Sequence, residues 1–386
     1  MPFPRGCKTS FSWIEENGSC TNMMTKSRVK TLAQEVGFHA CGITIPKPIP
    51  EAEEALKNWS DQGKHGEMKY LENYEARRDQ FWERFGTAKS IIVLGINYFS
   101  KLKNPPPSFP PVWGEDKGGG LTGRVARYAW GKDYHKVISK KLEVLKEKIK
   151  VETEREVHFD SAVDTKPLFE RAFAERAGLG FIGKQTQLLS LQFGPWLFLS
   201  ELITDLELEP DEPFAGSCGT CRLCIEECPT QAIEETGQID ARKCIAYLTI
   251  EHKTEIPVEL RHKIGNWVFG CDECLNVCPY TAKQKETDWR ELTSEFGFGS
   301  ELDLEKLFEI KSNRDYEKQF GENAISRANR KQLLRNACVV LGNSGSLRAL
   351  PILEKALEDS SPLVREHARW AISQIQNKPQ VTASID

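Results

Sequence analysis

The sequence predicts a mixed α/β domain, then a short cysteine-rich domain, and finally an α-helical domain. Three observations support this order. Apolar stretches of strand length alternate with amphipathic helical stretches up to about residue 210. Eight of the 12 cysteines then fall between residues 218 and 278, and short amphipathic helices follow one another towards the C-terminus. We place the domain boundaries at residues 1–24 for a variable N-terminal extension, then 25–210, 211–290 and 291–386.

Length and composition are typical of a globular protein with two or three domains. The chain has 386 residues, a net charge of −4, 39% hydrophobic residues and 28% charged residues. Its longest apolar stretches are of strand length and its N-terminus lacks the apolar core of a secretory signal, so we expect no membrane span. Clustered cysteines indicate metal binding in a reducing compartment, and we therefore expect a cytoplasmic location. Because the net charge is negative, any nucleic-acid contact would come from local basic patches.

The α/β region alternates helices and strands in a pattern that suits one sizeable core. Residues 88–98 form a β-branched apolar run, which predicts a buried strand. Ile138, Leu142 and Leu145 are spaced as on one face of a helix, which predicts a helix over residues 134–150. The other expected elements are helices over 27–36 and 165–177, strands over 41–45 and ending near 160–164, a loop over 104–123 and a β-hairpin over 188–206.

Gly178, Gly180 and Gly183, followed by Lys184, imitate the glycine fingerprint of dinucleotide-binding proteins. In that fingerprint the glycines join a strand to the helix that follows it. Here they follow a predicted helix, so we reject nucleotide binding at this position. A tight backbone that passes close to a bulky cofactor agrees better with the pattern.

The C-terminal region predicts two or three short helices, each with one apolar face. A break at residues 342–345 and a helix start at 360–362 separate these faces, in the manner of a HEAT-type helical pair. One such unit favours a capping or partner-binding appendage over a long repeat array. The apolar positions are Leu333, Leu334, Ala337 and Leu341 on the first helix, Leu350, Leu353 and Leu357 on the second, and Val364, Ala368, Ala371 and Ile375 on the third.

The first cysteine run has the spacing of a ferredoxin. Cys218, Cys221, Cys224 and Cys228, followed by Pro229, form the pattern C-x2-C-x2-C-x3-C-P. In two-cluster ferredoxins the first three thiolates of such a run bind one 4Fe–4S cluster, and the fourth binds the other cluster. The sequence therefore predicts two 4Fe–4S clusters.

The second cysteine run is one ligand short. Cys271, Cys274 and Cys278 repeat the last three positions of the pattern, but Val268 occupies the first. Cys244 is the only other cysteine between the two runs, and it brings the number of thiolates to the eight that two clusters need. Exchanging the last cysteine of each run assigns Cys218, Cys221, Cys224 and Cys278 to the first cluster and Cys228, Cys244, Cys271 and Cys274 to the second.

Zinc is the alternative ligand, because C-x2-C pairs also occur in zinc sites. Two consecutive runs that both end in C-x3-C-P are much more specific for iron–sulfur clusters, and zinc is disfavoured. The remaining cysteines lack ligand spacing, and we expect them to be ordinary thiols, with Cys338 in a helix core. These four are Cys7, Cys20, Cys41 and Cys338.

Asp164 is the strongest candidate for acid–base chemistry in the α/β region. It stands at the end of a predicted strand and just before a predicted helix that has Pro167 in its first turn. One interpretation is a carboxylate that anchors the N-terminus of that helix. The other is a general acid whose pKa is raised by a closed apolar site. The residues alone leave both interpretations open.

Five segments, taken together, resemble the epoxyqueuosine reductase family. The resemblance extends from about residue 26 to residue 375, and the segments match in order and spacing. They are RYAWGKDYH (127–135), VDTKPLFERAFAERAGLGFIGK (163–184), CGTCRLCIEECPTQAI (218–233), ARKCIAYLTIE (241–251) and GNWVFGCDECLNVCP (265–279).

This resemblance implies a fold and an activity. The fold is a cobalamin-binding α/β domain of nitroreductase-like (α+β) build, a ferredoxin-like domain with two 4Fe–4S clusters, and a C-terminal helical HEAT-like domain. The activity is the reduction of epoxyqueuosine to queuosine at the wobble position of a tRNA anticodon. Electrons from an external low-potential donor would pass through the clusters to cobalamin. A D-x-H-x-x-G motif is absent from the sequence, which agrees with base-off cobalamin. A monomer is the default expectation.

The resemblance also implies roles for single residues. The eight cluster cysteines of the family fall on the eight assigned above, Cys244 included, and its proton donor falls on Asp164. An arginine that contacts cobalamin falls on Arg77. The other positions expected near the corrin are Ala126, which cannot act as a side-chain ligand, Ala246 and Asp272.

RNA contacts are expected from local basic residues, although charged helix faces are as often merely solvated. His135 is expected to pack or hydrogen-bond and not to bind a metal. Two other functions remain open at this point: a cobalamin-dependent reductive dehalogenase and a ferredoxin-type electron carrier without catalytic activity. The basic candidates are Arg124, Arg127 and Lys132 in the first domain, and Arg327, Arg330, Lys331 and Arg335 in the helical tail.

Overall fold

A four-stranded antiparallel sheet lies at the centre of the first half of the structure, a computed structural model that describes residues 24–101, 121–282 and 284–377. Every residue of its second strand is buried, as expected for an apolar run between two other strands. The strands predicted near 41–45, 88–98 and 160–164 are confirmed. In order across the sheet they are β1 (Ala40–Thr44), β2 (Ser90–Asn97), β7 (Leu197–Thr204) and β4 (Phe159–Ala162).

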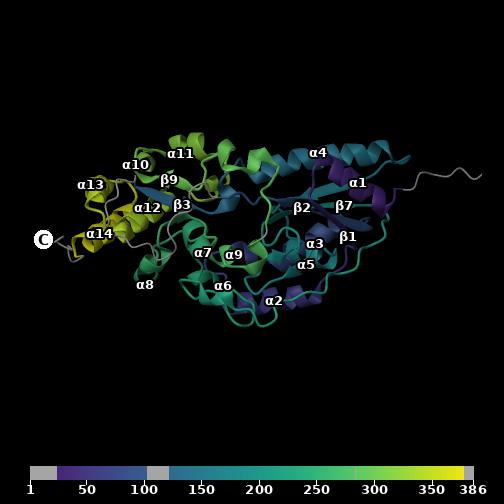
Figure 1. Ribbon diagram of the computed structural model, residues 1–386, viewed down its shortest axis with the longest axis horizontal. Helices are drawn as coiled ribbons and strands as arrows, with labels where there is room; N and C mark the ends of the chain where they lie inside the picture. Colours follow the sequence, from purple (N-terminus) through teal and green to yellow (C-terminus); the bar gives the residue numbers. More distant parts are fainter. Residues whose placement is uncertain (1–23, 102–120, 283, 378–386) are drawn as a thin grey trace, which may run out of the picture.

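Helices cover both faces of this sheet (Figure 1). Ile92 and Leu94 of β2 belong to the core under α1 and α4, whereas Ile91 and Val93 belong to the core under α3 and α5. This division follows from the alternation of side chains along a strand. The helices predicted at 27–36 and 134–150 are confirmed, whereas the polar α2 and α3 were not predicted. The bounds are α1 (Lys26–Val36), α2 (Pro50–Asp61), α3 (Tyr74–Arg84), α4 (Tyr134–Val151) and α5 (Glu170–Arg176).

Two predicted elements of this region differ from the structure. The helix expected over 165–177 is the shorter α5, because the chain first turns through Pro167 before the helix begins. The expected hairpin over 188–206 is not formed as one unit. Its first part, β6 (Leu188–Leu189), pairs with β5 (Phe181–Ile182), whereas β7 pairs with β2 and β4.

The glycines after α5 are explained by close contacts within the protein. A Cβ atom at Gly180 would lie 2.3 Å from the carbonyl oxygen of Leu189, so only glycine allows β5 to approach β6 this closely. Gly178 has a φ of +79°, and a Cβ atom there would lie 2.7 Å from the carbonyl oxygen of Glu212. These contacts account for the two glycines.

A second, three-stranded sheet joins segments that are far apart in the sequence. Its central strand β3 runs parallel to β8 and antiparallel to β9. The central strand β3 comes from the α/β region, β8 from the cysteine-rich region and β9 from the start of the helical region. These strands are β3 (Thr122–Val125), β8 (Trp267–Phe269) and β9 (Glu301–Asp303).

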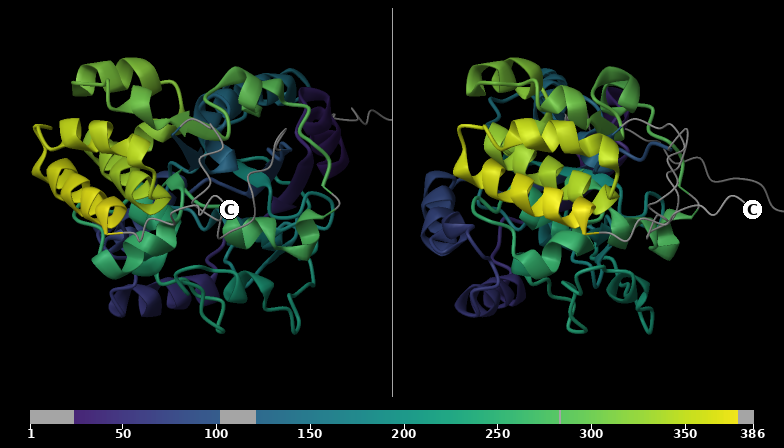
Figure 2. Two further views of the ribbon diagram at one scale, coloured as in Figure 1. Left: turned by 60° about the vertical axis from the view of Figure 1, so that its left-hand side comes forward. Right: turned by 90° about the vertical axis from the view of Figure 1, so that its left-hand side faces the viewer.

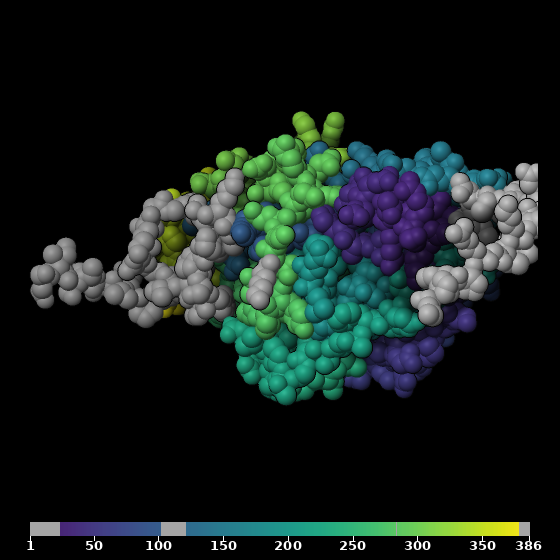
Figure 3. All heavy atoms as spheres, turned by 45° about the vertical axis from the view of Figure 1, so that its right-hand side comes forward, coloured from purple at the N-terminus to yellow at the C-terminus, as the bar shows by residue number. Residues whose placement is uncertain are grey.

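The cysteine-rich region consists of loops with short helices and packs against the first sheet. Figure 3 shows the green segment near residues 280–300 beside the purple α1, above the teal cysteine-rich loops. Here the indole Nε1 of Trp289 donates a 2.8 Å hydrogen bond to the carbonyl oxygen of Gly37. The short helices are α6 (Leu223–Glu226), α7 (Ile245–Ile250), α8 (Val258–Arg261) and α9 (Glu273–Asn276).

The C-terminal helices form a compact group in which α12 packs along α14 (Figure 2). Their three predicted apolar faces and the break at Gly345, which has a φ of +66°, are confirmed. Cys338 is fully buried on α12, as predicted. In the described part of the chain, no helix is long and apolar enough to cross a membrane. The helices are α10 (Leu304–Leu307), α11 (Asn313–Phe320), α12 (Arg330–Ser344), α13 (Leu350–Ala356) and α14 (Pro362–Gln376).

Candidate active site and cluster-binding cysteines

The first cysteine quartet (Cys218, Cys221, Cys224 and Cys278) combines three thiols of the first run with the last thiol of the second. Burial raises the pKa of Cys278, and the three thiols of the first run add to this rise through their charges. Cys224 in turn lies in the field of Cys218 and Cys221. The structure thus brings these four thiols together across sixty residues of chain.

The second cysteine quartet (Cys228, Cys244, Cys271 and Cys274) gathers around the start of α7. Burial is the main cause that raises the pKa of Cys274 far above its usual value, and the charges of Cys244 and Cys228 follow. Burial also raises the pKa of Cys244, whereas hydrogen bonds from the backbone N–H groups of Tyr247 and Ala246 lower it and favour the thiolate. Cys244 therefore supplies the thiol that the second run lacks because Val268 stands in its first position.

Four thiols gathered at one place fit a cationic iron–sulfur core. Without positive charge between them, burial and mutual repulsion keep such thiols protonated, whereas metal coordination deprotonates a thiol outright. Within the described ranges, no three Cys, His, Asp or Glu side chains converge closely enough to hold one metal ion. Cys41 and Cys338 lie outside both quartets as free thiols, and Cys7 and Cys20 lie outside the described residues.

Lys184 holds the loop of the first quartet against the α/β domain. Its ammonium group donates hydrogen bonds to the carbonyl oxygens of Cys221, at 2.9 Å, and Gly219, at 3.2 Å. Its backbone N–H points at the Sγ of Cys218, 3.5 Å away. Sequence reasoning missed this role, because the lysine was considered only as part of the glycine fingerprint.

Ala126 and Asp272 lie beside the second quartet. The N–H of Ala126 donates to the carbonyl oxygen of Phe269, two residues before Cys271, at 2.8 Å. The next N–H, that of Arg127, donates to Oδ2 of Asp272 at 2.7 Å. Burial raises the pKa of Asp272, and the nearby guanidinium of Arg127 opposes that rise. Asp272 therefore fixes the backbone after β3 next to the second quartet.

Asp164 is exposed on the loop between β4 and α5. Its φ is +53°, a left-handed conformation that is uncommon for a residue other than glycine. The hydroxyl of Tyr134 donates to Oδ2 of Asp164 at 2.9 Å, and the N–H of Asp164 donates to Oε1 of Glu170 at 2.8 Å. The side chain does not cap α5, whose N-cap is Phe169. The interpretation of Asp164 as a helix anchor is therefore wrong.

Two further carboxyl groups lie behind Asp164. Glu201 on β7 is 0% exposed, and neither of its carboxyl oxygens has a hydrogen-bond partner among the described residues. Burial raises its pKa well above the usual value, and the charges of Glu170 and Asp164 raise it further. Burial also raises the pKa of Glu170, followed by the charge of Asp164. Sequence reasoning missed both residues; a glutamate inside the apolar run of β7 was the available signal.

Groups from the α/β domain and the helical tail surround Asp164. Its charge acts on Tyr70 of η1 (Lys69–Leu71), on the half-buried Tyr128, and on Arg327 at the end of η8 (Ala324–Arg327). Arg327 is exposed and its Nε lies 2.7 Å from a carboxyl oxygen of Glu251, just after α7. The α/β domain and the helical tail therefore contribute to the surroundings of this aspartate, and Glu251 of the cysteine-rich region holds Arg327 there.

Comparison with known proteins assigns the chain to a family. A curated epoxyqueuosine reductase from Xanthomonas campestris pv. campestris is 38% identical over 351 residues, which cover 90% of this chain and 95% of the relative. The chain belongs to the epoxyqueuosine reductase family. The relative from Escherichia coli K12 is 35% identical and covers 90% of this chain and 88% of its own length. These matches confirm the resemblance found in the sequence.

Family models and solved structures of epoxyqueuosine reductases agree with this assignment. The models match residues 78–165 (epoxyqueuosine reductase QueG), 217–281 (4Fe-4S double cluster binding domain) and 322–385 (HEAT repeats). The structure from Streptococcus thermophilus is 30% identical, with a TM-score of 0.79, and covers 92% of this chain and 91% of its own. An epoxyqueuosine reductase solved with a tRNA-Tyr epoxyqueuosine-modified stem loop is 32% identical, has a TM-score of 0.79 and covers 91% and 90%.

Within this family fold, several basic residues expected to contact RNA are internal. Arg127 is buried, and its guanidinium lies 4.2 Å from the ring centre of Trp196. Arg330 donates to the carbonyl oxygen of Ile310 at 2.7 Å and pairs with Asp359. These arginines hold the protein together, and the prediction that they contact RNA is wrong.

Three other basic candidates lie at or near the surface, whereas Arg335 is fully buried. Arg335 donates to backbone carbonyl oxygens of α7 and of the segment after it, so it too is internal. Lys331, next to Arg330 on α12, is exposed, and so is Lys132. Arg124 is partly buried between Glu273, at 3.0 Å, and the ring of Trp267.

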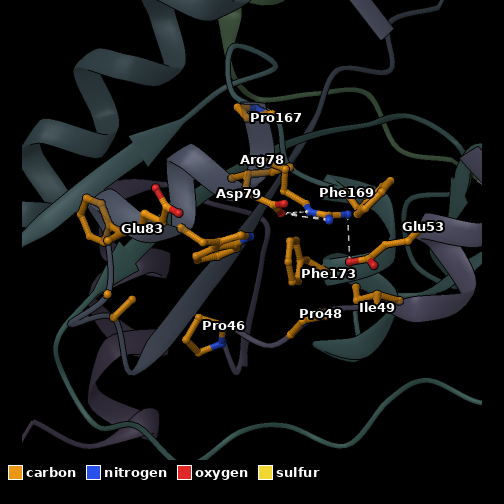
Figure 4. A pocket seen from close by; sticks show the side chains of 15 residues that line it. Pro46, Pro48, Ile49, Glu53, Arg78, Asp79, Glu83, Pro167, Phe169 and Phe173 are labelled. Carbon is orange, nitrogen blue, oxygen red and sulfur yellow. Dashed lines mark hydrogen bonds and ion pairs between the residues drawn. The ribbon is translucent and has the colours of Figure 1, made fainter. Parts of the chain in front are cut away.

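Arg77 and its neighbour Arg78 occupy different surroundings on α3. Arg78 lines a pocket of about 420 Å³ between α2, α3 and α5, where its guanidinium pairs with Glu53 at 2.9 Å and with Asp79 at 3.1 Å (Figure 4). Arg77 is exposed and lies 3.5 Å from the carbonyl oxygen of Tyr70. Arg77 therefore lies beside Tyr70, a residue on which the charge of Asp164 acts.

His135 has a local role beside this site. Its Nδ1 lies 2.8 Å from Oδ1 of Asp133, the N-cap of α4, and its ring stacks on Tyr134. These contacts orient the tyrosine that hydrogen-bonds Asp164, and they account for the imidazole without a metal.

Proposed function

We propose that this chain reduces epoxyqueuosine to queuosine at the wobble position of a tRNA anticodon, with electrons that pass through two 4Fe–4S clusters to base-off cobalamin. The observation that carries the proposal is the arrangement of two cysteine quartets that lead from a surface loop towards the exposed Asp164. The second quartet adjoins Ala126 and Ala246, and the charges of both Asp272 and Asp164 act on Tyr128.

The residues around the second quartet fit a flat macrocycle. Ala246 is partly exposed and follows the detached ligand Cys244, and its methyl group leaves room beside the cluster. Arg77, Ala126, Ala246 and Asp272 would hold cobalamin from the cluster side, and Asp164 would face it from the α/β domain. When bound, cobalamin supplies a strongly reducing cobalt centre next to the substrate.

This chain's own residues supply the acid. Tyr134 donates a hydrogen bond to Oδ2 of Asp164 and so fixes the carboxyl group, which delivers a proton to the oxygen that leaves the epoxide. A related Bacillus subtilis epoxyqueuosine reductase, 31% identical with a TM-score of 0.77, has been solved with its catalytic aspartate loop swung out of the active site. Asp164 likewise lies on a loop, and its left-handed backbone suits a residue whose position is part of the mechanism.

The helical tail is the proposed side of tRNA binding. A wobble base must leave its loop to reach an enclosed site, and phosphates are then bound by exposed cations. Arg327 and Lys331 are exposed cations of the tail, and Arg327 stands where the tail meets Asp164. The first quartet, whose loop carries the exposed Leu223 and Arg222, is the proposed entry point for an external low-potential donor.

Three further assignments follow from the same observations. An antiparallel sheet with helices on both faces supports a nitroreductase-like first domain over residues 25–210, followed by the ferredoxin-like and HEAT-like domains over 211–290 and 291–386. Two sets of reduced thiols support a cytoplasmic location. A monomer suffices for the chemistry, because all the proposed residues come from one chain.

The test is anaerobic reconstitution of both clusters, addition of cobalamin, and reduction of epoxyqueuosine in an anticodon stem-loop. Queuosine should form, and the Asp164→Asn variant should retain both clusters and cobalamin while losing most of the turnover. Absence of cobalamin binding in optical and EPR spectra would contradict the proposal. An aryl halide in a parallel assay tests the dehalogenase alternative, and cluster reduction without any turnover would favour the electron carrier.

A further inference from the structure

The two cysteine quartets are neighbours, but their surroundings differ. Helix α6, which carries Cys224 of the first quartet, packs against α9, which carries Cys274 of the second. The loop of the first quartet reaches the surface, where Arg222 and Leu223 are exposed. The side chains around the second quartet are buried, and they include Ile245, Leu248, Asp272 and Leu275. The potential of a 4Fe–4S cluster depends on solvent exposure, nearby charge and hydrogen bonds to its sulfurs, so we expect the two clusters to differ in potential.

Hydrogen bonds to sulfur do not distinguish the two quartets. In the first, the N–H of Lys184 points at the Sγ of Cys218, 3.5 Å away. In the second, the N–H of Ala232 donates to the Sγ of Cys228 at 3.3 Å. Each quartet thus receives a backbone donor, and the difference between them lies in exposure and in charge.

Lys184 brings a positive charge to the first quartet. It lies in the tight turn between β5 and β6, where the guanidinium of Arg171 donates to the carbonyl oxygen of Thr186 at 2.6 Å and holds the turn. From this turn its ammonium group donates to the carbonyl oxygens of Cys221 and Gly219, and no carboxylate among the described residues pairs with it. The charge is therefore held against the backbone of a cluster ligand without a counter-ion.

The acidic side chains close to Lys184 are paired with other cations. A Cβ atom at Gly237 would lie 3.7 Å from the Cα of Lys184, so the loop around residue 237 passes beside this lysine. The ion pairs of this region join Glu226 and Glu235 to Arg222, and Glu234 to Lys64. Glu227 is exposed, where water screens its charge. The ammonium group of Lys184 therefore keeps its effect on the first quartet.

The charged groups near the second quartet compensate one another. Asp272 accepts the N–H of Arg127 at 2.7 Å, and the guanidinium of the same arginine lies 4.0 Å away. Glu273 pairs with Arg124 at 3.0 Å. Lys243, next to the detached cysteine ligand, is exposed, and water screens its charge. These cations near the second quartet are thus either paired or in solvent.

We propose that Lys184 raises the reduction potential of the first cluster above that of the second, so that an electron from the donor waits at the surface cluster. Reduction adds one negative charge to a cluster, and a held ammonium group favours that charge. The external donor loses one electron to the first cluster. The first cluster is then oxidised by one electron as the second is reduced by one, and no proton moves. Lys184 touches the cluster loop and not the substrate, so it is a positioning residue.

This role deepens the electron path of the proposed function and rests on the two clusters of that function. Conversion of an epoxide to an alkene consumes two electrons, whereas each cluster passes one at a time. An electron that already waits at the first cluster leaves only one to be collected from the donor during turnover.

The test is a reductive titration of the full-length chain with both clusters, followed by EPR, without cobalamin or tRNA. In the wild type the first cluster should be reduced before the second, whose signal Cys278→Ala identifies because it should keep that cluster alone. Lys184→Gln keeps the backbone N–H and a side-chain donor but loses the charge. At a fixed solution potential, the ratio of reduced to oxidised first cluster should fall about 10-fold, a shift of about 59 mV for one electron. The second cluster should be unchanged, and Lys184→Arg should restore the wild-type ratio.

Lys243→Met is the matched control, since it removes an exposed lysine beside a ligand of the second cluster. It should leave the ratio for the first cluster unchanged. A purely structural role of Lys184 would lower the iron content without shifting the potential of the clusters that remain. If Lys184→Gln loses iron, the order of reduction in the wild type decides.

Three results would overturn the proposal: reduction of the second cluster first or of both together in the wild type, an unchanged ratio in Lys184→Gln with full iron content, or an equal fall in Lys243→Met. Because the titration uses neither tRNA nor cobalamin, failure of the wild type to reduce epoxyqueuosine would overturn the proposed function and leave this assignment standing.

Discussion

The hydroxyl group of Tyr134 lies 2.9 Å from Oδ2 of Asp164 and donates a hydrogen bond to it. Tyr134 begins α4, and its ring is held between His135 and Phe198, with ring centres 4.0 and 4.3 Å away. The carboxyl group of a residue on an exposed loop is thereby tied to a rigid helix. Orientation of the acid thus depends on a side chain thirty residues earlier in the chain.

Replacement of Tyr134 by phenylalanine removes this tie and keeps the ring stack. We expect turnover to fall about 10-fold, the effect of losing one hydrogen bond worth about 1.4 kcal/mol. Both clusters and cobalamin affinity should be unchanged. Combination with Asp164→Asn provides the control, because the tyrosine can act only through this carboxyl group. An additive loss in the double variant would show that the tyrosine acts elsewhere.

The exchange of cysteines between the two runs predicts which cluster each variant loses. Cys278→Ala should remove the cluster of the first run, whereas Cys228→Ala should remove the cluster next to Cys244. Either variant should keep about four of the eight iron atoms. EPR of the reduced protein, with Cys41→Ala as the control outside both quartets, measures which signal is lost. If each variant removed the cluster of its own run, the exchange would be wrong.

Local spacing allowed the iron–sulfur part of the site to be predicted from sequence. The two runs are contiguous patterns, and counting then singled out Cys244. Asp164 stood out by its place between a predicted strand and a predicted helix, but its role as proton donor came from the family resemblance. Glu201 did not stand out, since a single glutamate in an apolar strand becomes informative only when both faces of that strand are known to be covered. The pairing of β6 with β5 likewise depends on a contact that no local pattern encodes.

Charge was the least reliable guide. Arg127 and Arg335 stand in sequences with other cations and suggested an RNA surface, yet both are buried. A guanidinium with five donors can satisfy several carbonyl oxygens at once, and this makes arginine suitable for joining segments inside a protein. The sequence of α12 does not distinguish Lys331, which is exposed, from Arg335, one helical turn later. Only the packing of α12 against α7 separates them.

Arg335 should therefore matter for stability and not for RNA affinity. It donates to the carbonyl oxygens of Leu248, His252 and Thr254 at 2.6 to 2.8 Å. Arg335→Leu removes these three hydrogen bonds, and of the acceptors His252 keeps a bond from the side chain of Gln332 at 3.0 Å. We expect a loss of about 3 kcal/mol in the free energy of unfolding. Urea unfolding followed by circular dichroism measures this loss.

Lys331→Ala is the matched control for Arg335 on the same helix. It should leave the urea midpoint unchanged within about 0.5 kcal/mol and should lower the salt dependence of tRNA binding by roughly one ion. A lower urea midpoint for Lys331→Ala, or an unchanged midpoint for Arg335→Leu, would contradict the assignment of Arg335 to stability and of Lys331 to RNA binding.

His367 predicts how the stability of the helical tail depends on pH. It is 0% exposed on α14, its Nε2 accepts the N–H of Ile256 at 3.3 Å, and its Nδ1 lies 2.8 Å from the carbonyl oxygen of Leu363. Burial, and then the charge of Arg261, lowers the pKa of His367 to about 3. The folded protein therefore keeps this imidazole neutral, whereas the unfolded chain protonates it below about pH 6.5.

Between these two pKa values the unfolded state binds one more proton, so stability falls as the pH decreases from about 6.5 towards 3. At pH 5 this histidine alone should lower the free energy of unfolding by about 2 kcal/mol relative to pH 7.5. His367→Gln should be less stable than the wild type at pH 7.5, because it loses packing, but should lose less on acidification. Urea midpoints at both pH values measure the difference, with the exposed His158→Gln as the control. Parallel losses in the wild type and His367→Gln would mean that the imidazole is already charged in the folded protein, paired with the carboxylate of Glu366 at 2.7 Å.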